Sequence, residues 1–484
     1  MTGLKTTVKS VIFTPTSKYL ENISLMSKQL FSVTDARGLS VTGLSDTQIK
    51  TYDQILLDTY HYVPGTADEL KSLLEEAPEF VLGNVLRGYS TMTDGSVSGK
   101  TVAQGYLENA TKLTSGATPR ERLHIAALGH WISGEHEARN AVWEDIIGKW
   151  PADLLAYRQL TGALFWNGDK KRQLAAAVQT LPYWSAEIPG YGLFLGPLAF
   201  ALEEAGRFGL AERYAREALE INSTDLWSLH ALAHVFEMQG RSTEGEAHIE
   251  SVADKLNDYN LFRGHIWWHL ALFKMAQGKL DEVLGLVDKE IYPGTSNFYL
   301  DIQNAASMLS RLEFQGVNVG DRWDRIAKAS RETLSDHTVL FTVPHQAMAL
   351  ARSGEETHIA NALDQWMSAG SNANGQSLLA AKVAEAIADF HLGRFSDALD
   401  KFARLRFELP DLGASHAQQD IYYQYMVMAA IEQEDIPRTK SLLRERIANR
   451  AETEADWTEA RARLAEIERV ESKAEAIMML RRGI

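Results

Sequence analysis

The chain has 484 residues, of which 45% are hydrophobic and 23% charged, a composition typical of folded proteins and too apolar for a disordered one. Its formal net charge of −15 at pH 7 argues against non-specific binding to nucleic acid or to an anionic membrane, because both need a basic surface. It contains no cysteine, which excludes disulfides, thiolate nucleophiles and cysteine zinc sites and fits a reducing compartment.

Residues 1–40 lack a periodic apolar pattern and predict an N-terminal arm that packs on the rest of the chain or stays loose. This stretch has no continuous apolar core of signal-peptide length. The longest apolar run, Tyr191–Leu202, is too short to span a bilayer and contains glycine and proline. We therefore expect a cytoplasmic protein without a membrane partner.

Helix-turn-helix units are predicted from residue 41 onward. Ser45–His61 and Thr66–Glu76 have the apolar spacing of two helices. Beyond them, glycines recur where one helical pattern ends and the next begins, each 34 to 39 residues after the one before: Gly134, Gly168, Gly206, Gly240, Gly278, Gly316, Gly354 and Gly393. A period of this length is typical of a solenoid built from helix-turn-helix units.

Small residues within the units resemble those of the tetratricopeptide repeat, as at Gly206, Ala211 and Ala218, where they let paired helices approach closely. The sequence therefore predicts an all-α fold, an α-solenoid of about eight to nine tetratricopeptide-like units that forms a right-handed superhelix. The repeat array is expected over 41–435. Capping helices with a polar outer face are expected over 436–484.

Histidines occupy equivalent positions in several units. His124 and His230 precede the turn glycine of their unit by 10 residues, and His269 and His345 precede theirs by 9. In a tetratricopeptide-like superhelix the first helix of each unit lines the concave side, so we expect these rings to face one inner groove. Residues one or two helical turns away share that face: His234, Glu237 and His265.

Two histidine pairs, His230/His234 and His265/His269, have the i, i+4 spacing by which a helix presents two imidazoles to one ion. No HExxH signature is present and no motif requires a cofactor. Two interpretations remain open: a divalent metal site, or ordinary half-buried histidines whose nitrogens bind backbone groups. Further ligands or hydrogen-bond acceptors are available in Asp301, His345, His416 and Asp420.

Three connections between units are longer than a repeat needs and rich in aromatic residues: Leu181–Gly192, Ile291–Leu300 and Phe407–His416. Their side chains either fill gaps between imperfectly packed units or close the groove. The groove candidates among the aromatic residues are Tyr183, Trp184, Tyr191 and Trp268. The adjacent acids Glu203 and Glu204 are interpreted as a solvated helix end.

A set of segments between residue 34 and about residue 420 resembles one named family. They are TDARGLSVTGLS, RERLHIAALGHWISGEHEARN, LPYWSAEIPGYGLFLGPLAFALEEAGR, LHALAHVFEMQGRSTEG, GHIWWHLALFKMAQGKLDEVLGLVD, GVNVGDRW and LGASHAQQD. Together they resemble the tetratricopeptide repeat protein 38 family. The resemblance implies an all-helical repeat protein and no particular reaction. It also implies recurring motif positions at His124, His230, His234, His265, His269, Asp301, His345, His416 and Asp420.

Two functions follow from these patterns. The first is a non-catalytic binding protein whose concave groove holds a peptide, a partner protein or a small ligand. The second is an enzyme acting on a small molecule, in which the convergent histidines and Asp301 serve as acid–base groups or metal ligands. The first predicts an open groove, and the second predicts a deep pocket closed by the aromatic connections.

Overall fold

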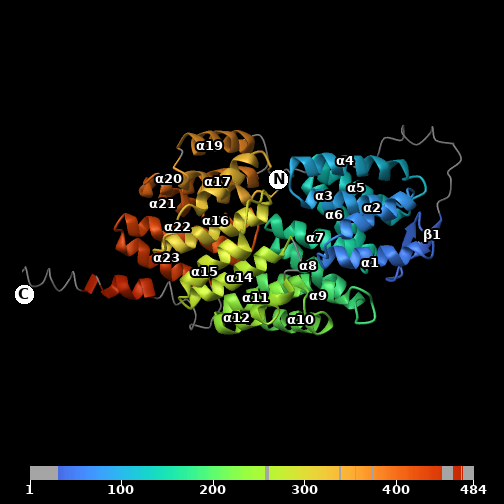
Figure 1. Ribbon diagram of the computed structural model, residues 1–484, viewed down its shortest axis with the longest axis horizontal. Coiled ribbons are helices and arrows are strands. Elements are labelled where there is room, and N and C mark those ends of the chain that lie inside the picture. Colours follow the sequence, from blue (N-terminus) through green and yellow to red (C-terminus); the bar gives the residue numbers. More distant parts are fainter. Residues whose placement is uncertain are drawn as a thin grey trace, which may run out of the picture.

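The computed structural model describes residues 31–256, 261–336, 339–354, 356–371, 375–449, 462–469 and 471–472. This part of the chain is helical almost throughout, so the predicted all-α solenoid is confirmed (Figure 1). Two short strands precede the helices, β1 (Ser32–Thr34) and β2 (Ser40–Thr42), and pair antiparallel with Ser32 opposite Thr42. The rest of the predicted arm, residues 1–30, lies outside the described residues.

The first half of the chain forms successive helix pairs. Their bounds are α1 (Gln48–Tyr60), α2 (Thr66–Glu76), α3 (Val81–Thr93), α4 (Val97–Lys112), α5 (Pro119–Ser133), α6 (His136–Lys149), α7 (Leu154–Trp166), α8 (Lys170–Thr180), α9 (Tyr191–Glu204), α10 (Phe208–Ile221), α11 (Leu226–Gln239) and α12 (Ser242–Glu250). A 3-10 turn, η1 (Leu181–Tyr183), stands between α8 and α9.

The second half continues the same plan. Its helices are α13 (Ala253–Leu256), α14 (Arg263–Ala276), α15 (Leu280–Leu286), α16 (Tyr299–Phe314), α17 (Arg322–Glu332), α18 (Thr342–Arg352), α19 (Glu356–Ser371), α20 (Gly375–His391), α21 (Phe395–Leu405), α22 (His416–Glu432) and α23 (Ile436–Ala448). A π-helical turn, η2 (Val287–Ile291), extends α15, and a 3-10 turn, η3 (Leu409–Leu412), precedes α22. In the region 436–484, where capping helices were expected, α23 is followed by helical residues at 462–469 and 471–472, and residues 450–461, 470 and 473–484 lie outside the described residues.

The turn glycines predicted from the period end helices in the structure. All eight have a positive φ, from 65° at Gly240 to 81° at Gly316, a conformation that a residue with a Cβ adopts only with strain. At Gly134 the left-handed residue lets the next N–H, of Glu135, donate to the carbonyl of His130. The glycine period therefore gave the correct positions for the first-helix ends.

Successive units stack through their first helices. Helix α9 packs against its partner α10 and against α11, the first helix of the next unit, and α18 packs in the same way against α19 and α20. In Figure 1 the early helices (blue to cyan) occupy one end of the molecule and the late ones (orange to red) the other, with α9 to α12 (green) between them. No helix in the described ranges is both long and apolar enough to cross a membrane.

The hairpin is tied to the array. The backbone N–H and the hydroxyl of Thr42 both donate to the carboxylate of Glu121 on α5, at 2.9 and 2.8 Å. Arg120 on the same helix donates to the carbonyl of Ser40 at 2.9 Å. Residues 32–42 therefore pack on the repeats.

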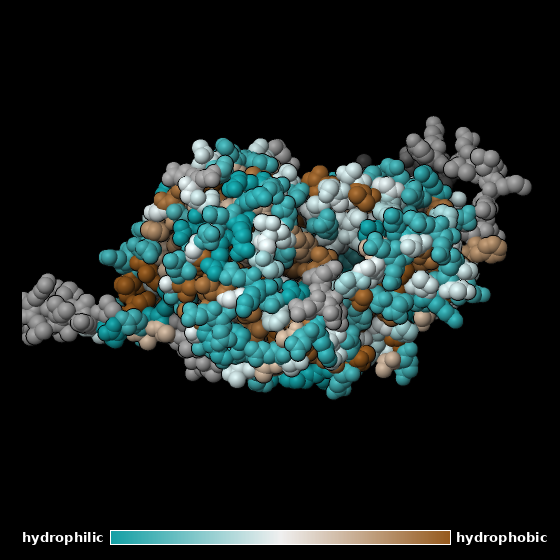
Figure 2. Space-filling view, in the orientation of Figure 1, coloured by the Kyte–Doolittle hydropathy of each residue, from teal (hydrophilic) through white to brown (hydrophobic). Residues whose placement is uncertain are grey.

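Helix α22 returns to helices that come much earlier in the chain, packing against α11 and α16. Arg311 on α16 donates to the carbonyl of Ala417 at 2.9 Å, and the hydroxyls of Ser310 and Tyr425 lie 3.0 Å apart. The chain itself thus fills part of the side on which an open groove was predicted. The face shown in Figure 2 is mostly hydrophilic, with hydrophobic side chains in small separate areas.

Candidate functional site

Four histidines from two neighbouring first helices meet in the interior. His230 and His234 lie on one face of α11, and His265 and His269 lie on one face of α14. One ring nitrogen from each of the four lies within 4.8 Å of the others. Their exposed fractions are only 0 to 2%. We call this set the histidine group.

Hydrogen bonding fixes one of the tautomers. His265 Nδ1 lies 2.8 Å from the side-chain oxygen of Asn304, which only accepts, so Nδ1 carries the proton and Nε2 carries a lone pair. That Nε2 lies 3.2 Å from Nε2 of His230, which in turn lies 3.0 Å from Nε2 of His234. Three ring nitrogens therefore converge at hydrogen-bond distance.

The remaining nitrogens of the group are poorly satisfied. Among the described residues, neither nitrogen of His269 has a hydrogen-bond partner, and Nδ1 of His230 has none. A buried polar atom without a partner costs about 1–3 kcal/mol. The buried His345 avoids this cost at Nδ1, which donates to the carbonyl of Phe341 at 2.8 Å.

The group is electrically neutral near neutral pH. Burial lowers the pKa of all four rings, to about 3 at His234 and about 4 at His265. At His230 and His269 the neighbouring histidines lower the pKa further, because adjacent rings do not protonate together. Neutral imidazoles are the form in which histidine ligates a metal.

Aromatic side chains enclose the histidine group. Trp268 stacks on His265 with ring centres 5.2 Å apart, and its indole N–H donates to Ser307. Phe262 and Phe200 approach the ring of His230 at 4.9 and 5.0 Å. The enclosure keeps water away from the ring nitrogens.

Two buried acids flank the group, where a solvated helix end was expected. Glu203 and Glu204, in the last turn of α9, are 1% and 5% exposed, so that interpretation was wrong. An oxygen of Glu203 lies 3.6 Å from Nδ1 of His234. Burial alone would raise the pKa of Glu204, but Lys170 at 2.5 Å and the neighbouring His416 hold it at about 2. The sequence signal for this burial was the apolar run Tyr191–Leu202, which directly precedes the two acids.

The expectation of one open groove lined by all the register histidines was wrong. Of the predicted histidines, all of which the structure describes, it brings together His230, His234, His265 and His269 and places His124 and His345 elsewhere. His124 lies between Asp153 and Tyr89, at 3.1 and 3.2 Å, and His345 is buried beside Phe341 and Tyr422. The physical reason is that neighbouring first helices cover both rings and that Tyr422 of α22 packs on His345.

The other candidates occupy separate places. Ser296 donates to Asp301 at 2.6 Å, and burial raises the pKa of this carboxyl to about 6. His416 is partly exposed and pairs with Glu204. Trp184 stacks on Phe194, Tyr191 donates to Glu217, and the side chain of Tyr183 is exposed.

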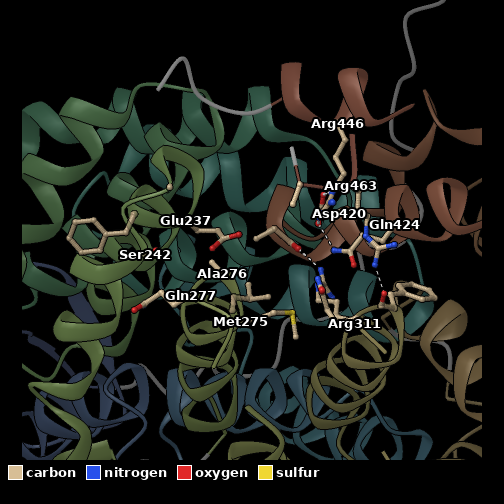
Figure 3. Close-up of a pocket in the computed structure, with 18 residues that line it drawn as sticks. Glu237, Ser242, Met275, Ala276, Gln277, Arg311, Asp420, Gln424, Arg446 and Arg463 are labelled. Atoms are coloured by element: carbon tan, nitrogen blue, oxygen red, sulfur yellow. Dashed lines mark hydrogen bonds and ion pairs between the residues drawn. The ribbon is translucent and has the colours of Figure 1, made fainter. Parts of the chain in front are cut away.

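A hollow of about 540 Å³ lies near the histidine group, between the ends of α11, α14 and α16 and the helices α22 and α23 (Figure 3). The predicted Glu237 and Asp420 line it, together with three arginines that the sequence patterns did not single out: Arg311, Arg446 and Arg463. Asp420 accepts two hydrogen bonds from Arg446, both at 2.8 Å. None of the three aromatic connections supplies a residue to its lining.

No family model matches the chain. Among solved structures, a human IFIT1 dimer with PPP-AAAA is 13% identical with a TM-score of 0.40, over 88% of this chain and 95% of that chain. A Rap protein complexed with competence and sporulation factor is 12% identical with a TM-score of 0.38, over 80% and 99%. The TPR domain of P58(IPK) is 13% identical with a TM-score of 0.22, over 74% and 99%.

These likenesses are too weak to carry an argument about function. The helices, their pairing and the turn glycines define the class: the chain is a tetratricopeptide-like helical-repeat protein.

Proposed function

We propose that this repeat protein binds a short acidic segment of a partner protein in the hollow between α11, α14, α16 and α22. The observation that carries the proposal is the charge of the lining. Three arginines outnumber Glu237 and Asp420 there, in a chain whose formal net charge is −15. A locally positive concave site in an acidic protein favours an anionic ligand.

The arrangement of the charges supports an elongated ligand. Arg311, Arg446 and Arg463 lie together on one side of the hollow, while Glu237 and Gln277 lie on the other (Figure 3). The volume suits a few side chains and not a whole domain. A peptide would place its acidic group against the arginines and its remaining side chains toward Met275 and Ala276.

The geometry favours binding over the enzyme alternative. None of the four histidines lines the hollow, and all are enclosed by aromatic rings, so a substrate in the hollow does not reach them.

We further propose that the chain belongs with the tetratricopeptide repeat protein 38 family, on the segments quoted above. We also propose that it acts in the cytoplasm, which its lack of cysteine supports.

Fluorescence polarisation with labelled eight-residue peptide pools, one acidic and one basic, tests the binding site. Ala276 is exposed at the end of α14 and lines the hollow, so Ala276→Trp should weaken binding of the acidic pool at least about tenfold by filling the space. Ala175→Trp, at an exposed alanine of α8, is the matched control and should bind as the wild type does. Equal binding of the two pools, or unchanged binding by Ala276→Trp, would contradict the proposal.

A further inference from the structure

The histidine group spans the junction between two consecutive units. Each helix contributes an i, i+4 pair, and the pairs face each other across the α11–α14 contact. Side chains four residues apart lie above one another on a helix, so two such pairs surround a single point.

The protons available cannot satisfy this arrangement. Nε2 of His265 only accepts, because its Nδ1 donates to Asn304. His230 Nε2 can offer at most one hydrogen to the two nitrogens at 3.0 and 3.2 Å. His269 has no partner for either nitrogen within the described chain. A cation at the centre would accept one lone pair from each ring and remove the mismatch among the nitrogens that face it.

We propose that His230, His234, His265 and His269 form a closed structural site for one divalent transition-metal ion. Neutral imidazoles suit Zn²⁺ and its first-row neighbours and not Mg²⁺ or Ca²⁺, which prefer oxygen. The Zn–N bond of 2.0–2.1 Å implies ligand nitrogens roughly 3.3–3.4 Å apart in a tetrahedron. The separations from His230 Nε2 to Nε2 of His234 and of His265, 3.0 and 3.2 Å, are close to that value, and all four ligand nitrogens lie within 4.8 Å of one another.

Two of the four rings, His265 and His234, have polar neighbours that support such a site. Asn304 fixes the ring of His265 so that Nε2 faces the centre. Glu203 lies 3.6 Å from Nδ1 of His234 on the far side of that ring, beyond hydrogen-bond distance but close enough to balance part of the charge of the ion. With exposed fractions of 0 to 2%, the four rings leave no position open to water or substrate. A closed site of this kind fastens α11 to α14.

The test uses the purified full chain, stripped with a chelator and then titrated with Zn²⁺. We expect one tightly bound equivalent and a thermal midpoint that rises with Zn²⁺ concentration, because an ion bound only by the folded state stabilises it. His269→Phe should lose both effects, whereas His345→Gln, at a buried histidine outside the group, should keep them. The double variant His130→Ala/His416→Ala controls for Zn²⁺ bound at more exposed histidines, and it should still bind one equivalent of Zn²⁺.

The proposal is overturned if Zn²⁺, Co²⁺, Ni²⁺ and Cu²⁺ all fail to raise the midpoint of the wild type. It is also overturned if His269→Phe binds Zn²⁺ as tightly as the wild type, which would mark the bound ion as adventitious. If His269→Phe does not fold, Glu203→Gln replaces it, since it removes no ring and should weaken Zn²⁺ binding about 10–100-fold. Unchanged affinity in that variant would count against the proposal.

Discussion

His124 and His230 hold the same place in their units, ten residues before the turn glycine, yet their surroundings differ in kind. The neighbouring units give His124 polar partners, Asp153 at the N-cap of α7 and the hydroxyl of Tyr89 on α3. At the corresponding places His230 meets the rings of Phe262 and Phe200.

The repeat register therefore decides where a side chain points, and the adjacent units decide what it does there. The region around His124 is a satisfied network in which Asp153 also accepts from Arg120 at 2.6 Å and from the backbone of Ala156 at 2.8 Å. The region around His230 is an unsatisfied group of nitrogens. The first has the form of a structural network, and the second has the form of a ligand set.

The largest expected effect tests the satisfied network. Asp153→Ala removes the acceptor shared by His124 and Arg120 and leaves a buried guanidinium without its carboxylate. We expect a loss of about 3–5 kcal/mol in the free energy of unfolding, measured by urea denaturation. A loss below about 1 kcal/mol would show that the network is not a stabilising unit.

A matched pair of variants compares the two regions directly. His124→Phe removes a hydrogen bond to an ionised group and should cost about 1.5–3 kcal/mol. His230→Phe, measured in the metal-free protein, removes a ring with an unpartnered nitrogen from aromatic surroundings and should cost less than about 1.5 kcal/mol. Equal losses in the free energy of unfolding for the two variants, measured by urea denaturation, would contradict the proposed difference between the two regions.

A pH series extends the comparison to His345. Burial lowers its pKa to about 3, with Arg311 facing it from α16 and Tyr422 from α22. Histidine in the unfolded chain has a pKa of about 6.5, so below that pH the unfolded chain binds a proton that the folded chain does not. The free energy of unfolding therefore falls by about 1.4 kcal/mol for each unit by which the pH is lowered. His345→Gln should flatten the dependence between pH 6 and 4.5 by one proton in urea denaturation at each pH, and an unchanged slope would contradict this account.

The smallest effect concerns the support of the histidine group. Asn304→Leu removes the acceptor that fixes the tautomer of His265. We expect an approximately tenfold weaker Zn²⁺ affinity, about 1.4 kcal/mol, measured by competition with a chromophoric chelator. The control is Gln303→Leu, which removes a neighbouring buried amide that donates to Thr342. This variant loses a buried polar group away from the ion and should keep the wild-type Zn²⁺ affinity.

The sequence predicted the class of fold and the facing of the two histidine pairs because both depend on local periodicity. Turn glycines such as Gly240 need a left-handed backbone, and an i, i+4 spacing places His230 and His234 on one face whatever surrounds the helix.

Helical periodicity could not predict which faces of the helices are buried. Whether a face looks into a groove or into a core depends on distant segments, and here α22 returns across nearly 180 residues to pack on α11. The same long-range packing brings the start of α22 to the end of α9, where the N–H of His416 donates to the carboxylate of Glu204 at 3.3 Å. The sequence did not predict the strand pairing of residues 32–42, because strands of three residues are too short to show a periodic pattern.

The most direct test of the central claim is X-ray absorption spectroscopy at the zinc edge on the chelator-stripped protein reloaded with one equivalent of Zn²⁺. We predict four nitrogen neighbours at 2.0–2.1 Å with the scattering pattern of imidazole rings. A shell of five or six oxygen atoms, or the same spectrum from His230→Phe/His269→Phe, would contradict a four-histidine site.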